Sequence, residues 1–191
     1  MEEEKREETS SSSWKGNVLG IVAMIAAVVV IAILLRTFLF VPYEIPSKSM
    51  QDTIMPGDMV FSEKVTYYMR QPERGDIVTF TDPEVPTRTL IKRVIATGGQ
   101  TVDLVNGEVV VDGAALDEPY TKGKPSYPLS RTAVNADISY PYKVPEGSVW
   151  VMGDNRTESQ DSRYFGAVPV DTISGRASLV YWPLSSFGLL S

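Results

Sequence analysis

Ser49 is the residue whose place in the sequence points most directly to chemistry. It lies in the run Ile45-Pro46-Ser47-Lys48-Ser49-Met50, just beyond a long apolar stretch. The chain contains no histidine and no cysteine, so it can form neither a Ser-His-Asp triad nor a cysteine nucleophile. If Ser49 is a nucleophile, a lysine is the plausible strong base that remains to take its proton.

The residues before Ser49 can place a second hydroxyl beside it. Pro46 biases Ile45 toward an extended conformation. If the chain stays extended through Met50, Ser47 and Ser49 point to the same side, since side chains alternate along a strand. One hydroxyl could then attack while the other donates a hydrogen bond to the developing oxyanion. On its own, Ser-x-Ser is more typical of a serine-rich linker.

Lys92 is the candidate base. A strand through this region places Lys92 on the same face as Leu90 and Val94. An apolar face removes water from the charged amine and lowers its pKa, so the neutral amine can accept a serine proton near neutral pH. The alternative is a lysine on an exposed edge strand, where it discourages aggregation. Lys48 is nearer to the serine in the sequence, but alternation points it to the opposite side.

A third polar segment follows the apolar run at residues 149–152. It reads Gly153-Asp154-Asn155-Arg156-Thr157-Glu158-Ser159-Gln160-Asp161-Ser162-Arg163. A solvated loop is the simplest interpretation. A serine-lysine dyad, however, needs neighbouring groups that hold the lysine and satisfy its hydrogen bonds, and this segment contains suitable side chains.

An apolar stretch near the N-terminus predicts a membrane anchor. Residues 18–35 carry no charge, and this length is close to the roughly 20 residues that cross a bilayer. The stretch is too long for the apolar part of a cleaved signal peptide, and no small-x-small site follows it. We therefore expect a disordered cytoplasmic leader at residues 1–16, a transmembrane helix at 17–41 and an outer domain at 42–191.

Flanking charges do not decide the orientation of this anchor. A short leader inside and a large domain outside is the usual arrangement. We therefore expect a single-pass protein of the cell membrane, in contact with lipid, with a cytoplasmic N-terminus and an extracytoplasmic domain.

Composition excludes several classes of function. The net charge is −6, from 18 basic and 24 acidic residues, which argues against nucleic acid as a partner. The absence of histidine and cysteine argues against a zinc enzyme and excludes a disulfide scaffold. We expect no metal, no cofactor and a monomeric protein.

The outer domain lacks helical periodicity and reads as mainly β, with strands at the spacing of a sandwich or barrel. Asn106-Gly107 favours a type I′ turn between two alternating runs, which makes it the clearest hairpin. Residues 113–145 are rich in Pro, Gly and Ser and predict a looser excursion. The expected strands are residues 76–81, 87–97, 101–105, 108–112, 148–152 and 177–182.

Taken together, these segments resemble the type I signal peptidases, in the short single-span form typical of Gram-positive bacteria. The resemblance runs from the apolar span to the C-terminus, and four motifs occur in the family's order. They are Pro46-Ser47-Lys48-Ser49-Met50, Arg74-Gly75-Asp76-Ile77-Val78, Ile91-Lys92-Arg93-Val94, and Gly153-Asp154-Asn155-Arg156 with Ser159, Asp161, Ser162 and Arg163.

The resemblance implies a membrane-bound serine endopeptidase that removes signal peptides from secretory preproteins at Ala-x-Ala-like sites. Ser49 would be the nucleophile and Lys92 the general base. The Ser47 hydroxyl and the Ser49 backbone N–H would form the oxyanion hole, and Ser159 would hydrogen-bond the Lys92 amine and orient it. The implied fold is the family's mostly antiparallel β domain, with an apolar surface resting on the membrane.

The resemblance also implies supporting residues. Asp154 would pair with Arg93, and Asp161 with Arg163. The candidates for the small apolar pockets that admit substrate side chains are Ile45, Met50, Leu90, Ile91 and Met152.

One position departs from the family pattern. Asp52-Thr53-Ile54 stands where the family usually has Pro-Thr-Leu, and the loss of the proline is expected to loosen or re-aim the turn behind the nucleophile.

Two other functions are compatible with parts of the pattern. A self-cleaving repressor-type serine-lysine protease shares the Ser-Met element, but it would carry a helix-turn-helix domain in place of the apolar span. An anchored β-rich adhesion or assembly module is the non-enzymatic alternative. Loss of Ser49 or Lys92 would have favoured that module.

Overall fold

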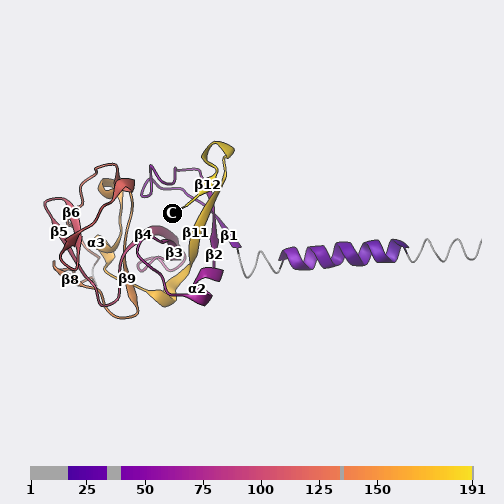
Figure 1. The fold of residues 1–191 in the computed structure, drawn as a ribbon, viewed down its shortest axis with the longest axis horizontal. Helices are drawn as coiled ribbons and strands as arrows, with labels where there is room; N and C mark the ends of the chain where they lie inside the picture. Colours follow the sequence, from indigo (N-terminus) through magenta and orange to yellow (C-terminus); the bar gives the residue numbers. More distant parts are fainter. Residues whose placement is uncertain (1–16, 34–39, 134–135, 191) are drawn as a thin grey trace, which may run out of the picture. The chain divides into compact units, whose positions relative to one another are not determined.

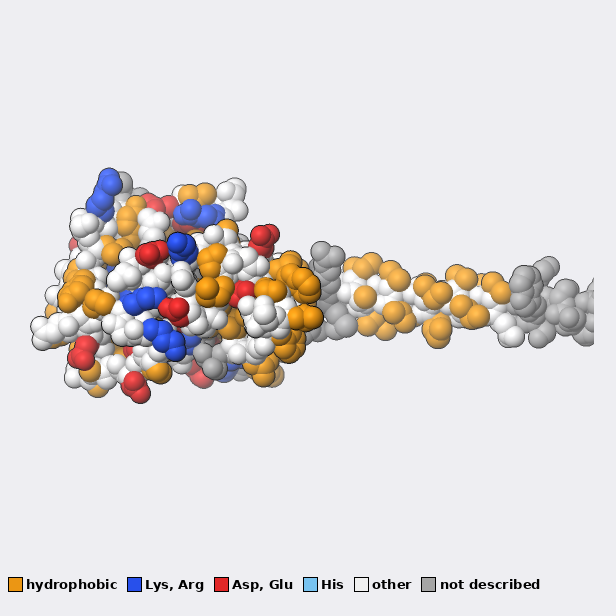
Figure 2. Space-filling model, turned by 90° about the horizontal axis from the view of Figure 1, so that it is seen from above, with side chains coloured by type: hydrophobic (Ala, Val, Ile, Leu, Met, Phe, Trp, Pro, Cys, Tyr) orange, Lys and Arg blue, Asp and Glu red, His pale blue; other side chains and the backbone are white. Residues whose placement is uncertain are grey.

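The computed structural model describes residues 17–33, 40–133 and 136–190, and the chain divides into two units, Met1–Phe40 and Val41–Ser191. The first unit contains a helix over residues 17–33, whose large apolar side chains are exposed from Val18 to Ile33 (Figure 2). Within the described residues, no helix is both long enough and apolar enough to span a membrane. The predicted leader and residues 34–39 of the predicted span lie outside the described residues.

The second unit is mainly antiparallel β, as predicted (Figure 1). The larger of its two described sheets has the strand order β1-β2-β11-β3-β4-β9-β10, and β12 pairs with β11. Its successive pairs from β2 to β10 are antiparallel, which places β4 between β3 and β9. The strands are β1 (Phe40–Glu44), β2 (Met59–Glu63), β3 (Ile77–Thr81), β4 (Thr89–Thr97), β9 (Ser148–Met152), β10 (Val168–Pro169), β11 (Ile173–Trp182) and β12 (Gly188–Leu189).

The smaller sheet contains the predicted hairpin. Its order is β7-β6-β5-β8, and it lies on the opposite side of the domain from β2 and β11 (Figure 1). Asn106 and Gly107 have φ angles of 54° and 87°, so both central residues are left-handed, as a type I′ turn requires. The strands are β5 (Thr101–Val105), β6 (Glu108–Val111), β7 (Ala114–Ala115) and β8 (Tyr142–Lys143).

Short helical turns join these strands. Within residues 113–133 and 136–145, the excursion contains β7, a 3-10 turn and β8, and the other described residues belong to no helix or strand. Among the described residues of the second unit, the α-helices are α2 (Val65–Met69) and α3 (Ser162–Phe165), and the 3-10 turns are η1 (Pro119–Thr121), η2 (Arg156–Glu158), η3 (Val170–Thr172) and η4 (Leu184–Ser186).

Strand β4 contributes to the packing on both of its faces, which is why it can position a buried lysine. Ile91 packs in one apolar cluster with Met50 and Ile54. Val94 packs in a second cluster, and Ile95 in a third, beside the small sheet. The middle of β4 therefore lies away from water, and polar side chains there need partners from other segments.

Candidate active site

Ser49 and Lys92 meet in the structure although 43 residues separate them in the chain. Ser49 stands in a turn after β1, and Lys92 lies in the middle of β4. The Lys92 Nζ is 2.8 Å from the Ser49 Oγ and also donates to the Ile91 carbonyl at 2.8 Å. Ser49 is 7% exposed and Lys92 is 3% exposed. This arrangement lets an amine take the proton of a hydroxyl with little competition from water.

Burial makes Lys92 suitable as a base. Loss of solvation lowers the pKa of its ammonium from the usual 10.5 to about 8, against the opposing effect of Asp161 and Asp82, while the positive charge of Arg88 lowers the pKa further. At pH 8 about half of the molecules would carry a neutral amine, compared with roughly 0.3% for an ordinary lysine. Leu90 and Val94, which alternation places on the same face of β4 as Lys92, pack in one apolar cluster, as expected.

Ser47 lies beside Ser49. Its Oγ is 3.3 Å from the Ser49 Oγ, so the two hydroxyls share one side, as predicted. The chain does not stay extended through Met50, however, because it bends at residues 47–48 and turns at Ser49. Lys48 is exposed to solvent.

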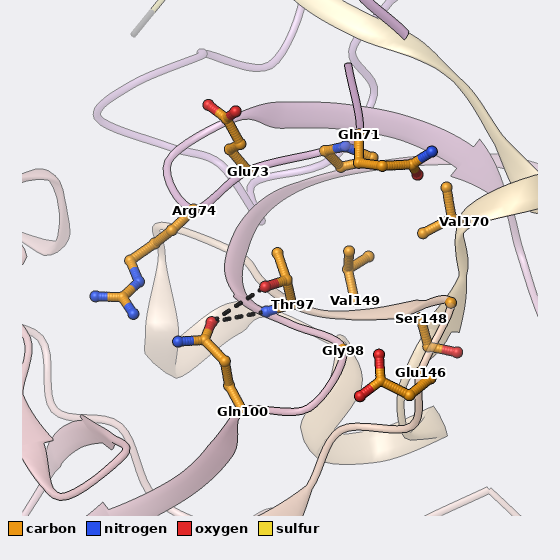
Figure 3. A pocket seen from close by; sticks show the side chains of 12 residues that line it. Gln71, Glu73, Arg74, Thr97, Gly98, Gln100, Glu146, Ser148, Val149 and Val170 are labelled. Carbon is orange, nitrogen blue, oxygen red and sulfur yellow. Dashed lines mark hydrogen bonds between the residues drawn. The ribbon is translucent and has the colours of Figure 1, made fainter.

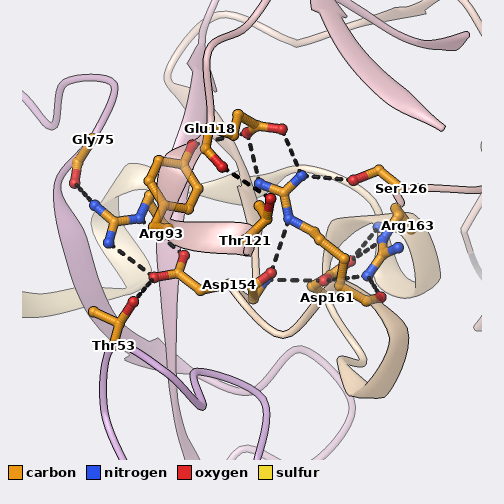
Figure 4. A network of polar contacts seen from close by, with 12 residues as sticks. Thr53, Gly75, Arg93, Glu118, Thr121, Ser126, Asp154, Asp161 and Arg163 are labelled. Carbon is orange, nitrogen blue, oxygen red and sulfur yellow. Dashed lines mark hydrogen bonds and ion pairs between the residues drawn. The ribbon is translucent and has the colours of Figure 1, made fainter. Parts of the chain in front are cut away.

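Most of the segment after β9 is buried instead of solvated, with Thr157, Glu158 and Gln160 exposed, and its aspartates pair as predicted (Figure 4). The Asp154 carboxylate accepts two hydrogen bonds from Arg93, each 2.9 Å long. Asp161 accepts two from Arg163, also at 2.9 Å. Such bidentate contacts fix the relative orientation of the two side chains as well as pairing their charges.

These two aspartates also hold the backbone around the dyad. Asp161 accepts a hydrogen bond of 3.0 Å from the Gly153 backbone N–H and caps helix α3. Asp154 accepts one of 2.6 Å from the Thr53 hydroxyl, in the turn that follows the nucleophile. The segment after β9 is therefore tied to the nucleophile turn through Asp154.

Ser159 does not occupy its predicted role. Its Oγ is buried and makes no hydrogen bond to Lys92, and it lies near Asp161, where it helps to lower the pKa of that carboxyl. The predicted hydrogen bond to Lys92 is thus absent, and the Lys92 Nζ instead contacts the Ser49 Oγ and the Ile91 carbonyl. Ser159 packs against Gly153, where a methyl group in place of the glycine hydrogen would come within 2.3 Å of the Ser159 Oγ.

Asn155 and Gly153 have roles that the sequence did not reveal. The Asn155 side chain donates to the Lys48 carbonyl at 2.9 Å, and its backbone N–H donates to the Ser49 carbonyl at 3.1 Å. A Cβ at Gly153 would approach the same Ser49 carbonyl to 2.4 Å, so only glycine fits without a shift. Asn155 and Gly153 therefore position the main chain of Ser49, a role that their place in the motif at residues 153–156 did not specify.

The excursion is more tightly bound to the site than its composition predicts. Arg156 is fully buried and donates to both Glu118 carboxylate oxygens and to the Ser126 hydroxyl at distances of 2.6–2.8 Å. The Tyr120 ring lies under the Arg93 guanidinium, with 4.1 Å between the Arg93 Cζ and the ring centroid. The part of the excursion around η1 therefore closes over the two arginines.

The turn behind the nucleophile differs from the one that a proline would impose. Asp52 has a φ of 80°, whereas the proline ring restricts φ to about −65°. Its carboxylate pairs with Lys124 at 2.5 Å, which ties the turn to the excursion. The backbone at Asp52 therefore has a conformation that a proline could not adopt.

Two pockets open beside the dyad, and Ser47, Arg88, Leu90 and Lys92 line both. One, of about 200 Å³, is walled mainly by apolar groups from β1 and β4. It includes three of the predicted pocket residues, Ile45, Leu90 and Ile91.

The other pocket, of about 190 Å³, is more polar. It contains Ser49, Asp82, Glu84, Glu158 and Phe165, of which only the serine was predicted to belong to the site.

Met50 and Met152 do not reach a pocket surface, in contrast to the prediction. Both side chains have no exposed area. Met50 packs with Ile54 in one apolar cluster, and Met152 packs with Trp150 in the cluster that includes residues of the small sheet. Their neighbours in the sequence are functional, but their own side chains belong to the core.

A larger pocket, of about 750 Å³, shares no lining residue with these two (Figure 3). It is bordered by the turn between β4 and β5 and by charged side chains that include Glu73, Arg74 and Glu146.

Comparison with known proteins agrees on one family. A family model described as signal peptidase, peptidase S26, matches residues 18–182, a range that contains every residue of the site. Probable signal peptidase I-1 of Synechocystis sp. is 39% identical over 176 residues, which cover 88% of this chain and 85% of that protein. Probable signal peptidase I-2 of the same organism is 36% identical over 196 residues, covering 98% and 82%. The crystal structure of a signal peptidase I from Enterococcus faecalis V583 is 28% identical, with a TM-score of 0.45, and covers 57% of this chain and 98% of that one.

Proposed function

The chain belongs to the peptidase S26 family of signal peptidases and is a serine peptidase of the signal peptidase I class; from that premise we propose that Ser49 is its nucleophile and Lys92 its general base. The observation that carries this proposal is the 2.8 Å contact between the Ser49 Oγ and the Lys92 Nζ, made by a lysine with a pKa of about 8. The substrates are secretory preproteins, from which the enzyme removes the signal peptide.

The reaction proceeds through an acyl-enzyme. Lys92 takes the hydroxyl proton as the Ser49 Oγ attacks the scissile carbonyl, and the Ser47 hydroxyl and the Ser49 backbone N–H stabilise the oxyanion. The Lys92 ammonium then gives its proton to the leaving amine as the C–N bond breaks. Water attacks the ester in the second half of the reaction, with Lys92 again accepting the proton.

The apolar pocket beside Ser49 and Lys92 can admit an apolar substrate side chain. Ile45, Leu90 and Ile91 line it, and its volume of about 200 Å³ has room for the methyl group of alanine. We therefore propose Ala-x-Ala-like cleavage sites.

Two apolar surfaces support a membrane-bound enzyme. We propose that the helix over residues 17–33 belongs to a single span at 17–41, as in the Gram-positive form, with the N-terminus in the cytoplasm and the peptidase domain outside the cell. Trp182, Leu184, Phe187 and Leu189, at and beyond the end of β11, are exposed and suited to rest on the lipid surface. We propose that the enzyme acts as a monomer.

Two substitutions test the dyad. Ser49→Ala and Lys92→Met should each abolish preprotein cleavage by the full-length protein in detergent, because each removes one reacting group. Circular dichroism and thermal unfolding should show an intact fold. Substantial cleavage by either folded variant would refute the dyad.

The dependence of the rate on pH tests the protonation state of Lys92. For the wild type, kcat/KM should rise with pH through about 8, because the neutral amine is the active form. A rate that stays constant from pH 8 down to pH 5 would exclude Lys92 as the base.

A further inference from the structure

Three carboxylates influence Lys92, and each is paired with its own guanidinium. Asp154 pairs with Arg93 and Asp161 with Arg163, as described above. The third is Asp82, which directly follows β3 and accepts a hydrogen bond of 2.5 Å from the Arg88 Nε. No motif in the sequence pointed to this third pair, because both residues lie in an irregular loop between β3 and β4.

The third pair differs from the other two in its exposure. The arginine side chains of the first two pairs are almost fully buried, whereas the Arg88 side chain is 52% exposed. Asp82 itself is only 2% exposed and also accepts from the Glu84 backbone N–H at 2.8 Å. Among the described residues, the salt-bridge partner of this buried carboxylate is therefore a partly exposed arginine.

Both members of the pair line the pocket that contains Ser49 and Lys92. A carboxylate facing an amine favours the protonated amine, and a guanidinium disfavours it. We propose that Arg88 is a positioning residue that compensates the charge of Asp82 and so prevents Asp82 from holding a proton on Lys92. The proposal rests on the role of Lys92 as the base and adds to it a residue that acts through Asp82.

The other charged groups around Lys92 do not compensate the charge of Asp82. From the segment after β9, Asp154 and Asp161 approach, and both are neutralised by buried arginines. Glu84 and Glu158 also line the pocket, but they are exposed and screened by water. Arg93 is next to Lys92 in β4, and its guanidinium forms an ion pair with Asp154.

Three variants separate charge compensation from a structural role. Arg88→Met leaves Asp82 uncompensated, so the acid limb of the kcat/KM profile should move to higher pH. A displacement of about half a unit to one unit would slow cleavage at pH 7 about three- to tenfold and leave the alkaline plateau unchanged. Asp82→Asn removes the carboxylate and should move the limb to lower pH, and the double variant should lie between the two.

Controls and a direct titration complete the experiment on the full-length protein. Arg88→Lys retains the positive charge, so its pH profile of kcat/KM should stay close to that of the wild type. Arg74→Met removes an exposed arginine from the separate pocket of Figure 3 and should leave the pH profile unchanged. The ¹³Cε resonance of Lys92, identified by its loss in Lys92→Met, should titrate with the same displacements.

The outcomes distinguish this proposal from the proposed function. Unshifted profiles and titrations in Arg88→Met and Asp82→Asn, with Lys92→Met inactive, would overturn the role of Arg88 and leave the dyad intact. A uniform loss of rate at every pH would also overturn it, because that result indicates a structural effect. Cleavage by Lys92→Met would instead refute the base itself.

Discussion

The two sheets of the outer domain bury different kinds of side chain. In β5 and β6 of the small sheet, the buried residues are Val102, Val109 and Val111. In the large sheet, β4 buries Lys92 and Arg93 next to each other. The first pattern is stabilised by burial of apolar area alone, whereas the second requires partners for each charge.

The difference lies in how far apart those partners are in the chain. The hairpin of the small sheet pairs neighbouring strands through a tight turn. Arg93, in contrast, meets Asp154 across 61 residues, and Lys92 meets Ser49 across 43. Changes near β4 should therefore affect both stability and catalysis, whereas changes in the small sheet should affect stability alone.

Asp161→Ala should give the largest effect. It leaves the buried Arg163 without its carboxylate and removes the acceptor of the Gly153 N–H, so the free energy of unfolding should fall by about 3 to 5 kcal/mol. Urea unfolding of the full-length protein in detergent measures the loss, and preprotein cleavage should fall with it. Asp171→Ala, at an exposed aspartate, is the matched control, and an equal loss there would contradict the prediction.

The same pair predicts an acid dependence. Burial opposes ionisation of Asp161, but Arg163 outweighs it and holds the pKa of that carboxyl below its usual value of 3.8. Its contribution to stability is therefore complete above the unfolded pKa and is lost as the pH falls through the lower folded pKa. The difference between wild type and Asp161→Asn should shrink below about pH 4.

Gly153→Ala should rank next and act mainly on catalysis. The added methyl group would lie 2.4 Å from the Ser49 carbonyl and must displace the nucleophile's main chain. A shift of that kind costs about 100-fold in kcat/KM, or about 2.7 kcal/mol of transition-state stabilisation. Ser159→Gly in the same chain removes only one of the two clashes, so it should recover part of the rate. Native kcat/KM in the single variant would show that the segment after β9 does not fix Ser49.

Val109→Ala should give the smallest effect and should separate the two regions. Removal of a buried apolar volume from the small sheet should lower the free energy of unfolding by about 1.5 to 2.5 kcal/mol. Below the unfolding midpoint, kcat/KM should equal that of the wild type. A parallel fall in kcat/KM would mean that the small sheet supports the dyad and that the contrast between the sheets is false.

The parts of the fold with local signals were predictable from sequence. Asn106-Gly107 predicted the hairpin because its backbone preferences are intrinsic, and alternation predicted that Lys92 would share an apolar face with Leu90 and Val94. The order of strands in the large sheet was not predicted, since β11 pairs with β2 and β3 at a separation of about a hundred residues.

The residues of the site also fall into those that the sequence predicted and those that it did not. Ser49, Lys92 and the two Asp–Arg pairs followed from motifs, because the residue types themselves carry the signal. Asn155, Gly153 and the Asp82–Arg88 pair were missed, since their roles depend on main-chain contacts and on the approach of separate loops. Met50 and Met152 were assigned to pockets by their proximity in sequence, and the direction of their side chains made that assignment wrong.

The backbone of Asp52 has a consequence for protein engineering. Consensus design replaces an unusual residue with the one that relatives prefer, on the expectation of added stability. In this chain the replacement would be proline at a position with a φ of 80°, which its ring cannot adopt. Asp52→Pro should therefore disturb the turn that carries the nucleophile and lower both stability and cleavage, whereas Asp52→Gly keeps the conformation. A sequence average is a poor guide at any position whose backbone conformation the preferred residue cannot adopt.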